Sequence, residues 1–391
     1  MAKLGEVCLI NPKSCALRDD TEVSFVPMTK VGECGEFDAS EIKHYSEVKK
    51  GFTNFQNDDI LFAKITPCME NGKGAIAQNM KNGVGFGSTE FHVLRPDTDK
   101  ITSEWLYYLT IWKTFRKEAE RNMTGSAGQK RVPKTFLENY VVNLPEIDTQ
   151  KNESKILRKV DDLISLRKQQ LAKLDELVKA RFVEMFGDLA APQCEYPELK
   201  LVDICADADD IKCGPFGTQL NKDEYKTKGV AVWEIPQINS GFSEMPTHFI
   251  TEEKAVILNA YSIEPGDIAM SRKGNVGKCG LFPEKLKKGI IHSDVLRIRV
   301  DKRKVDSCFM MYQLHFSEAV KRQIEMVSSG AIMAGINVTK LKQIKVRVPE
   351  LESQRMFAAF VERVDQQKQT VQQSLEKLEV MKKALMQEYF G

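Results

Sequence analysis

The chain has 391 residues with 57 Lys and Arg against 55 Asp and Glu, so its formal net charge is only +2, and 42% of its residues are apolar. This length allows two domains that each bury a core, and the balanced charge disfavours a protein that binds phosphate through bulk charge alone. No run approaches the roughly 20 apolar residues of a membrane span, and the N-terminus lacks the apolar core of a signal peptide, so we expect a cytoplasmic protein. The nine cysteines include no Cys-x-x-Cys pair, so we expect reduced thiols and no metal site.

The first 148 residues are typical of a mixed α/β segment, in which short β-rich runs alternate with Gly, Asn and Pro. Its predicted elements in chain order are strands at 59–63 and 91–94, helical spacing over 103–121, and a strand at 141–145. Residues 188–350 repeat this order, with strands at 267–271 and 295–299, helical spacing over 306–326, and a strand at 344–349. A proline ends the last strand of each segment.

The second half matches the first at an offset of 204 residues. The matches are Thr89-Glu90 with Ser293-Asp294, Leu144-Pro145 with Val348-Pro349, Gln150 with Gln354, Asp161 with Asp365, and Phe186-Gly187 with Phe390-Gly391. A register held over about 100 positions without a net gap indicates two copies of one structural unit.

A long helical segment is predicted after each mixed segment, at 149–187 and at 351–391. Each contains a helix of about 35 residues, roughly 151–187 and 354–391, with Gly187 and Gly391 where a helix C-cap belongs. Apolar residues recur every three or four positions between charged and amide side chains, which is typical of a coiled-coil seam. The predicted seam residues are Ile156, Val160, Leu163, Leu171, Leu174 and Val178 in the first helix, and Phe357, Phe360, Val364, Val371, Leu375 and Leu378 in the second. The alternative is two amphipathic helices, each packed on its own domain.

Helices of this length span on the order of 50 Å. If they pair antiparallel, the two globular segments lie at opposite ends and have pseudo-twofold symmetry. Their separation then exceeds one turn of B-DNA, about 34 Å. The repeat and the helices together predict a bipartite site on duplex DNA.

Enzyme motifs are incomplete. Gly274–Lys278 resembles a phosphate loop, but its spacing is GxxGK and Cys279 stands where a hydroxyl is needed. Gly83–Gly87 is glycine-rich but lacks a following helical pattern, and the five histidines have no Ser or Cys elbow nearby. We therefore expect no catalytic activity from the chain by itself.

Polar and basic loops follow the matched strands in both halves. Gly and Ser allow close approach of a backbone to phosphate, Lys and Arg neutralise phosphates or read guanine, and Asn and Gln can pair with adenine. The predicted DNA-binding residues are Lys64, Thr66, Asn71, Lys73, Ser126, Gln129, Lys130 and Arg131 in the first half, and Thr218, Gln219, Asn221, Arg272, Lys273, Asn275, Lys278, Ser328, Ser329 and Asn337 in the second. The alternative for any one of them is a solvated loop at a sheet edge. Because the loops differ between the halves, we expect them to read different half-sites.

The chain resembles, over essentially its whole length, the specificity subunits of type I restriction–modification systems. The resemblance is carried by Gly-Pro-Phe-Gly-Thr-Gln-Leu at 214–220, GDIAMSRKGNVGK at 266–278, the Leu/Val-Pro-Glu-x-x-x-Gln junctions at 144–150 and 348–354, and long helices that end in Phe-Gly. It implies an α/β fold with target recognition domains at 1–148 and 188–350. It also implies that the conserved helices at 149–187 and 351–391 pair as an antiparallel coiled coil.

The resemblance also implies the partners. Two adenine-N6 methyltransferase (modification) subunits would bind the chain, translocase–nuclease subunits would complete the restriction complex, and S-adenosylmethionine, ATP and Mg would belong to those partners. The DNA target would be bipartite and asymmetric, and no membrane is involved. Three alternatives stay open: a free-standing nuclease or methyltransferase, a coiled-coil adaptor that binds proteins, and a specificity subunit of a related restriction system without a type I motor.

Overall fold

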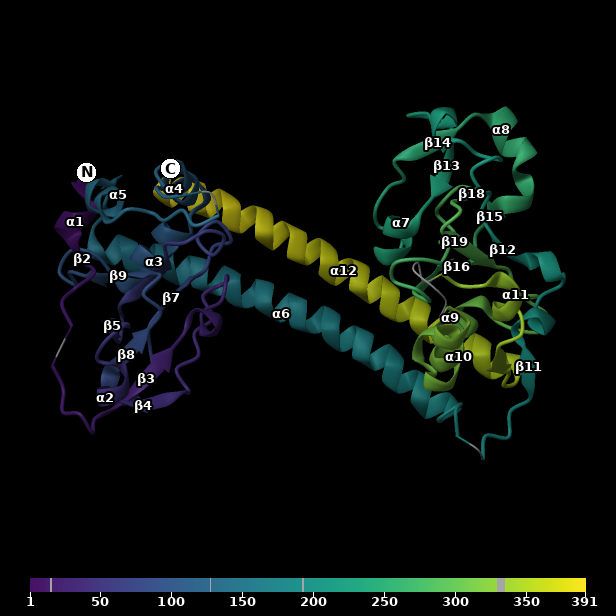
Figure 1. Ribbon diagram of the computed structural model, residues 1–391, viewed down its shortest axis with the longest axis horizontal. Helices are drawn as coiled ribbons and strands as arrows, with labels where there is room; N and C mark the ends of the chain where they lie inside the picture. The colour runs from purple at the N-terminus through teal and green to yellow at the C-terminus, as the bar shows by residue number, and fades with distance from the viewer. Residues whose placement is uncertain (15, 127, 192, 329–334) are drawn as a thin grey trace. The chain divides into compact units, whose positions relative to one another are not determined.

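The computed structural model describes residues 1–391 except 15, 127, 192 and 329–334, and the chain divides into two compact units. Unit 1 comprises Met1–Lys168 and Gln373–Gly391, and unit 2 comprises Gln169–Gln372. The long helices α6 (Ile147–Phe186) and α12 (Leu351–Phe390), teal and yellow in Figure 1, each contribute one part to each unit. The fold is therefore a mixed α/β arrangement in which both units contain segments of the same two helices.

The described part of unit 1 contains two four-stranded sheets. In the first, β6 (Ile60–Ala63) lies between a neighbouring strand on each side, and its Ile-Leu-Phe-Ala run is buried throughout. That antiparallel sheet has the order β2 (Cys8–Ile10), β9 (Phe91–Pro96), β6 (Ile60–Ala63) and β7 (Gly74–Ile76). The second has the order β4 (Ile42–His44), β3 (Glu22–Val26), β8 (Val84–Gly87) and β5 (Thr53–Gln56), with β3 and β8 parallel. A short antiparallel pair joins β1 (Ala2–Lys3) to β10 (Val141–Val142).

Unit 2 has the same strand order, which confirms the repeat. Its antiparallel sheet has the order β12 (Ile211–Cys213), β19 (Val295–Ile298), β16 (Ile268–Ser271) and β17 (Cys279–Leu281). Its other sheet has the order β14 (His248–Ile250), β13 (Val230–Trp233), β18 (Gly289–Ile291) and β15 (Ser262–Ile263), with β13 and β18 parallel. The short pair here is β11 (Glu198–Lys200) with β20 (Lys345–Arg347).

Helices connect these strands and contribute to the cores. The helices of unit 1 are α1 (Leu4–Val7), α2 (Tyr45–Val48), α3 (Ser103–Ile111), α4 (Lys113–Arg121) and α5 (Lys134–Asn139), and those of unit 2 are α7 (Ile235–Asn239), α8 (Glu252–Ile257), α9 (Ser307–Phe316), α10 (Glu318–Ser328) and α11 (Val338–Leu341). Short 3₁₀ turns are η1 (Met28–Lys30), η2 (Lys81–Gly83), η3 (Leu201–Ile204), η4 (Ala208–Asp210), η5 (Lys222–Glu224) and η6 (Asn259–Tyr261). The helical spacing predicted over 103–121 is divided at Trp112, and that over 306–326 at Ser317, because each of these residues has an extended backbone with ψ of 131° and 115°.

The matched glutamines explain the Pro-Glu-x-x-x-Gln junctions. Gln150 is fully buried, accepts from the Thr102 amide at 2.9 Å and donates to the Pro145 carbonyl at 2.8 Å. Gln354 does the same in unit 2, where it accepts from the Asp306 amide at 2.8 Å and donates to the Pro349 carbonyl at 2.7 Å. Because Thr102 and Asp306 are the N-caps of α3 and α9, each glutamine fastens the start of a long helix to the globular part of its unit.

Within each unit, α6 and α12 run antiparallel. In unit 1, Lys382 pairs with Asp161 at 2.6 Å and Arg167 donates to Ser374 at 3.1 Å. In unit 2, the ammonium of Lys368 lies 2.6 Å from Asp175. Each helix has 40 residues, somewhat more than predicted, and no helix in the described ranges has the length and apolarity needed to cross a membrane.

The seam differs from the prediction at two positions. Ile156 and Leu163 are 44% and 42% exposed, so their assignment to the seam is wrong. Leu157, which is fully buried, and half-buried Ile164 lie on the covered side instead. Each error exchanges two adjacent apolar residues, which spacings of three and four cannot distinguish. Of the other predicted seam residues, Val160, Leu174, Val178, Phe357, Val364, Val371 and Leu375 are buried, and Leu171, Phe360 and Leu378 are half-buried.

Candidate nucleic-acid interface

In unit 1, the two predicted loop segments lie next to each other. Ile65 and Arg131 form an antiparallel bridge, the Thr66 amide donates to the Lys130 carbonyl at 3.1 Å, and the Val132 amide donates to the Lys64 carbonyl at 2.9 Å. Beside them lies a cleft of about 690 Å³, lined by Thr66, Glu70, Lys117, Glu120, Arg121, Met123, Gly128 and Lys130. The structure thus brings together residues that are about 65 positions apart in the sequence, at the edge where β6 ends.

The predicted contact residues of unit 1 differ in their exposure and in the hydrogen bonds that they form within the unit. Asn71, Ser126, Gln129 and Lys130 are exposed, whereas Lys64, Thr66, Lys73 and Arg131 are half-buried. Arg131 pairs with both carboxylate oxygens of Glu90, at 2.8 and 2.9 Å, and this pairing raises the pKa of Arg131 and lowers the pKa of Glu90. The Lys73 ammonium donates to the Met28 carbonyl at 3.2 Å, and the Thr66 hydroxyl donates to Glu70 at 2.8 Å.

Arg116 holds the 69–73 segment from the interior of unit 1. It is 6% exposed and donates to the carbonyls of Met69 at 2.7 Å, Thr110 at 2.7 Å and Gly72 at 3.1 Å. Burial lowers the pKa of Arg116 to about 10. Sequence reasoning missed this residue because it lies in the charged pattern of α4, where nothing local distinguishes it from its neighbours.

In unit 2, four segments meet at the equivalent sheet edge, where β12 and β16 end and β19 begins. The Gly214 amide donates to the Val295 carbonyl at 3.1 Å, and the Arg272 amide donates to the Asp294 carbonyl at 2.8 Å. Ile336 donates its amide to the Arg272 carbonyl at 3.1 Å. The Arg272 guanidinium lies 5.3 Å from the centre of the Phe216 ring. A Cβ atom at position 214 would meet the carbonyls of Ile291 and His292, which explains the glycine of the Gly-Pro-Phe-Gly segment.

Several predicted contact residues of unit 2 have partners inside the unit. Lys273 pairs with Asp294 at 2.9 Å, and Lys278 donates to the Asn239 carbonyl at 2.8 Å. Asn337 is the N-cap of α11, the Ser328 hydroxyl donates to the Glu325 carbonyl at 2.8 Å, and Gln219 accepts from the Tyr261 hydroxyl at 2.9 Å. Thr218, Gln219, Asn221, Asn275 and Asn337 are exposed, Arg272, Lys273, Lys278 and Ser328 are half-buried, and Ser329 lies outside the described residues.

A second cleft of about 690 Å³ lies beside the Gly-Pro-Phe-Gly segment of unit 2. It is lined by Pro215, Gly217, Leu220, Asn221, Lys222, Tyr225, Glu234, His248, His292 and Ser293. Sequence reasoning missed Tyr225, Glu234, His248 and His292 as members of this site. They come from separate segments, and no motif or spacing in the sequence connects them.

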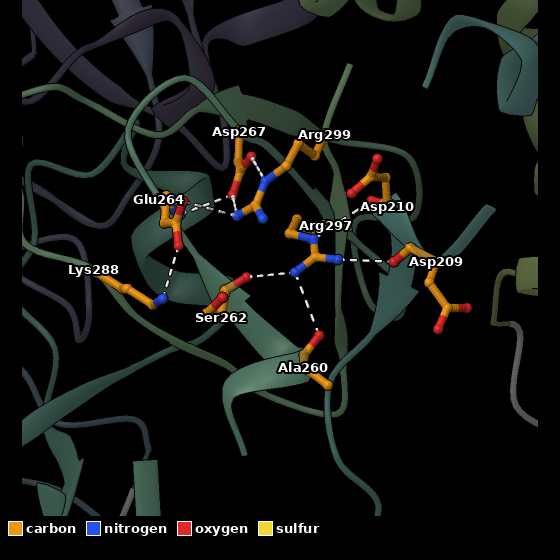
Figure 2. Close-up of polar contacts among 9 residues, drawn as sticks. All are labelled: Asp209, Asp210, Ala260, Ser262, Glu264, Asp267, Lys288, Arg297 and Arg299. Carbon is orange, nitrogen blue, oxygen red and sulfur yellow. Dashed lines mark hydrogen bonds and ion pairs between the residues drawn. The ribbon is translucent and has the colours of Figure 1, made fainter. Parts of the chain in front are cut away.

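A polar network around Arg297 and Arg299 anchors the sheet that contains β16 and β19, and Figure 2 shows its members. Arg297 is 4% exposed and donates to the carbonyls of Ser262 and Asp209, both at 2.8 Å, and its burial lowers its pKa. Arg299 makes two bonds of 2.7 Å to the two carboxylate oxygens of Asp267. Asp267 directly precedes β16, so this ion pair fixes the strand that leads into the 272–278 loop.

The same ion pair recurs in unit 1. Arg95 donates to Asp59 at 2.8 and 2.7 Å, and Asp59 directly precedes β6. The Asp59 and Asp267 carboxylates also accept backbone amides, from Gln56 at 2.7 Å and Glu264 at 2.8 Å. The matched strands 59–63 and 267–271 therefore share their anchoring chemistry as well as their place in the sheet.

Comparison with known proteins identifies the family. The model of the type I restriction modification DNA specificity domain matches residues 1–176 and 210–380. The EcoAI specificity subunit of Escherichia coli is 44% identical over 179 residues, covering 44% of this chain and 30% of that protein. The EcoEI specificity subunit of E. coli is 45% identical over 145 residues, covering 36% and 24%. The chain thus spans less than a third of either E. coli protein. A putative specificity subunit, MjaX, from Methanocaldococcus jannaschii is 25% identical over 378 residues, covering 93% and 83%.

Two solved structures share the fold. A chain from a study of complex assembly and conformational transition of the type I R-M system has a TM-score of 0.60 at 17% identity, covering 99% of this chain and 96% of that chain. The type I restriction-modification S subunit from M. genitalium has a TM-score of 0.60 at 14% identity, covering 100% and 95%. At these identities the likeness concerns the fold alone, and the family rests on the sequence match over both halves. The chain belongs to the type I restriction–modification DNA specificity family.

Proposed function

We propose that this chain is the DNA specificity subunit of a type I restriction–modification complex, in which each unit reads one half of a bipartite target. The observation that carries this proposal is the pairing of one scaffold with two different sets of loops. The strand order is the same in both units, and the predicted contact loops leave the same sheet edge in each. Equal scaffolds with unequal loops suit a target whose two halves occupy equivalent positions and differ in sequence.

The chemistry of the loops supports nucleic acid as the ligand. Unit 1 presents exposed Gln129 and Lys130, and unit 2 presents exposed Asn221 and Asn275. Lysines neutralise phosphates and position the protein, whereas amide side chains can donate to and accept from base edges. Because the net charge of the whole chain is only +2, the basic residues at these edges contribute more to DNA affinity than the overall charge does.

In this proposal the long helices set the spacer between the half-sites and dock two methyltransferase subunits. The repeated scaffold would offer each modification subunit an equivalent surface, and the chain itself would not be catalytic. S-adenosylmethionine, ATP and Mg would be bound by the modification and translocase–nuclease subunits. Because the target is cellular and incoming DNA, we expect the complex in the cytoplasm.

The test is methylation mapping in cells that express the chain together with its modification subunits. Single-molecule sequencing of the genomic DNA should show methylated adenines in one bipartite motif. The double variant Gln129→Ala/Lys130→Ala should then weaken or relax the half-site read by unit 1 alone. The double variant Asn221→Ala/Asn275→Ala should do the same to the half-site read by unit 2.

Lys50→Ala is the matched control, because Lys50 is an exposed cation after α2 that lines neither cleft. It should leave the motif unchanged. Absence of any methylated bipartite motif with the unaltered chain would sink the proposal, as would methyl transfer by the chain without a partner. Equal damage to both half-sites by either double variant would refute the assignment of one unit to each half.

A further inference from the structure

The cleft of unit 2 contains a carboxylate that the motifs did not indicate. Glu234 follows β13, is the N-cap of α7 and lines the cleft together with residues of the 215–222 segment, and its side chain is 19% exposed. Acidic side chains are repelled by the phosphates of DNA, so a carboxylate at this edge calls for a specific explanation.

The carboxylate is rigidly positioned. His248 Nδ1 lies 2.7 Å from one oxygen, Oε2, and this nitrogen must carry the hydrogen because an ionised carboxylate only accepts. The His248 ring stacks on Tyr225, with centroids 4.6 Å apart and an interplanar angle of 26°. Glu234 therefore cannot turn away from the cleft without losing a hydrogen bond to a ring that is itself held by stacking.

The other oxygen is not neutralised by any lysine or arginine that the structure describes. Oε1 lies 4.0 Å from His292 Nε2, beyond hydrogen-bond distance, and in the described part of the chain no Lys or Arg forms an ion pair with Glu234. Asp294, the other acid at this edge, differs because Lys273 neutralises it at 2.9 Å. As the N-cap of α7, Glu234 also faces the backbone amide of the third helical residue in a capping box, so it combines a fixed side chain that lines the cleft with carboxylate lone pairs that no described lysine or arginine neutralises.

A metal site explains this arrangement less well. Two histidines and one acid, Glu234, line the cleft, but the ring nitrogens face different oxygens of Glu234 at unequal distances of 2.7 and 4.0 Å. Among the residues that the structure describes, no group of three His, Cys, Asp or Glu side chains has a geometry that could hold a metal ion.

We infer that Glu234 is a specificity-determining residue that accepts a hydrogen bond from the 4-amino group of a cytosine in the half-site read by unit 2. This inference rests on the proposed function. In the major groove, hydrogen donors on bases are the amino groups of cytosine and adenine. In adenine the N7 acceptor lies beside the amino group, so a carboxylate that accepts from the amino group would have its other oxygen next to N7, and the two acceptors would repel each other. Cytosine offers its amino donor without an acceptor on the same base edge. A carboxylate therefore prefers cytosine to adenine.

The test uses the complex with modification subunits and a duplex that carries its mapped bipartite motif. Glu234→Gln should lower the preference for cytosine over adenine at one position of the second half-site by about tenfold, because an amide can pair with both N6 and N7 of adenine. Glu318→Gln is the control, since Glu318 forms an exposed pair with Lys321 at 2.9 Å and does not line the cleft. It should leave all base preferences unchanged.

A second measurement does not depend on the folding of a variant. Replacing the contacted cytosine by 2-pyrimidinone, which lacks the 4-amino group, should weaken binding of the unaltered complex about tenfold. The same replacement should cost the Glu234→Gln complex little, whereas 5-methylcytosine should bind both as cytosine does.

Unchanged preferences in Glu234→Gln, equal losses at both half-sites, or no cytosine in the half-site of unit 2 would each overturn the inference. If the unaltered complex recognises no bipartite duplex, the proposed function itself fails. The two failures are therefore distinguishable.

Discussion

The paired arginine and aspartate in each unit allow a direct test of the repeated scaffold. Arg299 donates twice to Asp267, whose side chain is only 4% exposed, and that of Arg299 is 32% exposed. Arg299→Met keeps much of the aliphatic stem but removes both bonds. It leaves a buried carboxylate whose remaining bond is to the Glu264 amide.

The expected loss follows from the burial of the aspartate. Removing one partner of a buried ion pair costs about 3–5 kcal/mol, because the other charge stays desolvated. Since about a third of Arg299 is exposed and water can partly replace it, we expect a value near the lower end, about 3 kcal/mol. Asp267→Asn in the Arg299→Met background should recover part of this loss, because a neutral amide carries no buried charge.

Native-state hydrogen exchange followed by mass spectrometry can assign the loss to one unit. Amides of β16 and β19 should exchange roughly 100-fold faster in Arg299→Met, with β6 and β9 little changed. Arg95→Met should produce the reverse pattern. Lys321→Met is the control, since its pair with Glu318 is exposed on both sides and contributes little to stability. A loss below about 1 kcal/mol for Arg299→Met, or equal acceleration in both units, would refute the reasoning.

Two further predictions concern the cores. Phe357→Ala should lower the free energy of unfolding, measured in urea titrations, by about 3–5 kcal/mol, because Phe357 is fully buried and its ring centroid lies 5.3 Å from that of Phe182. Val380 is exposed, so the control Val380→Ala should cost under about 0.5 kcal/mol. Similar losses in the two variants would contradict this packing. Burial raises the pKa of the Cys279 thiol from 9.0 in the unfolded chain to about 12. The contribution of this thiol to stability is therefore fully present below pH 9 and is lost as the pH rises toward 12. At pH 8.5, iodoacetamide should label exposed Cys34 well before Cys279, which should react only on unfolding; equal rates would count against this burial.

The sequence by itself determined the features that depend on local pattern and on self-similarity. The offset of 204 residues indicated two equivalent units, and spacings of three and four residues indicated the long helices. The matched strands at 59–63 and 267–271 placed the loops that follow them at one sheet edge in each unit. These inferences hold because period and repetition are properties of neighbouring or duplicated residues.

Tertiary structure alone decided features that depend on residues far apart in the chain. It placed Leu157 rather than Ile156 on the covered side of α6, because only packing into the core of unit 1 distinguishes two adjacent apolar side chains. It joined Glu234 and His248 to the 215–222 segment, although no spacing relates them. Such convergence results from strand pairing across long sequence separations, so it could not be predicted from the local pattern around any of these residues.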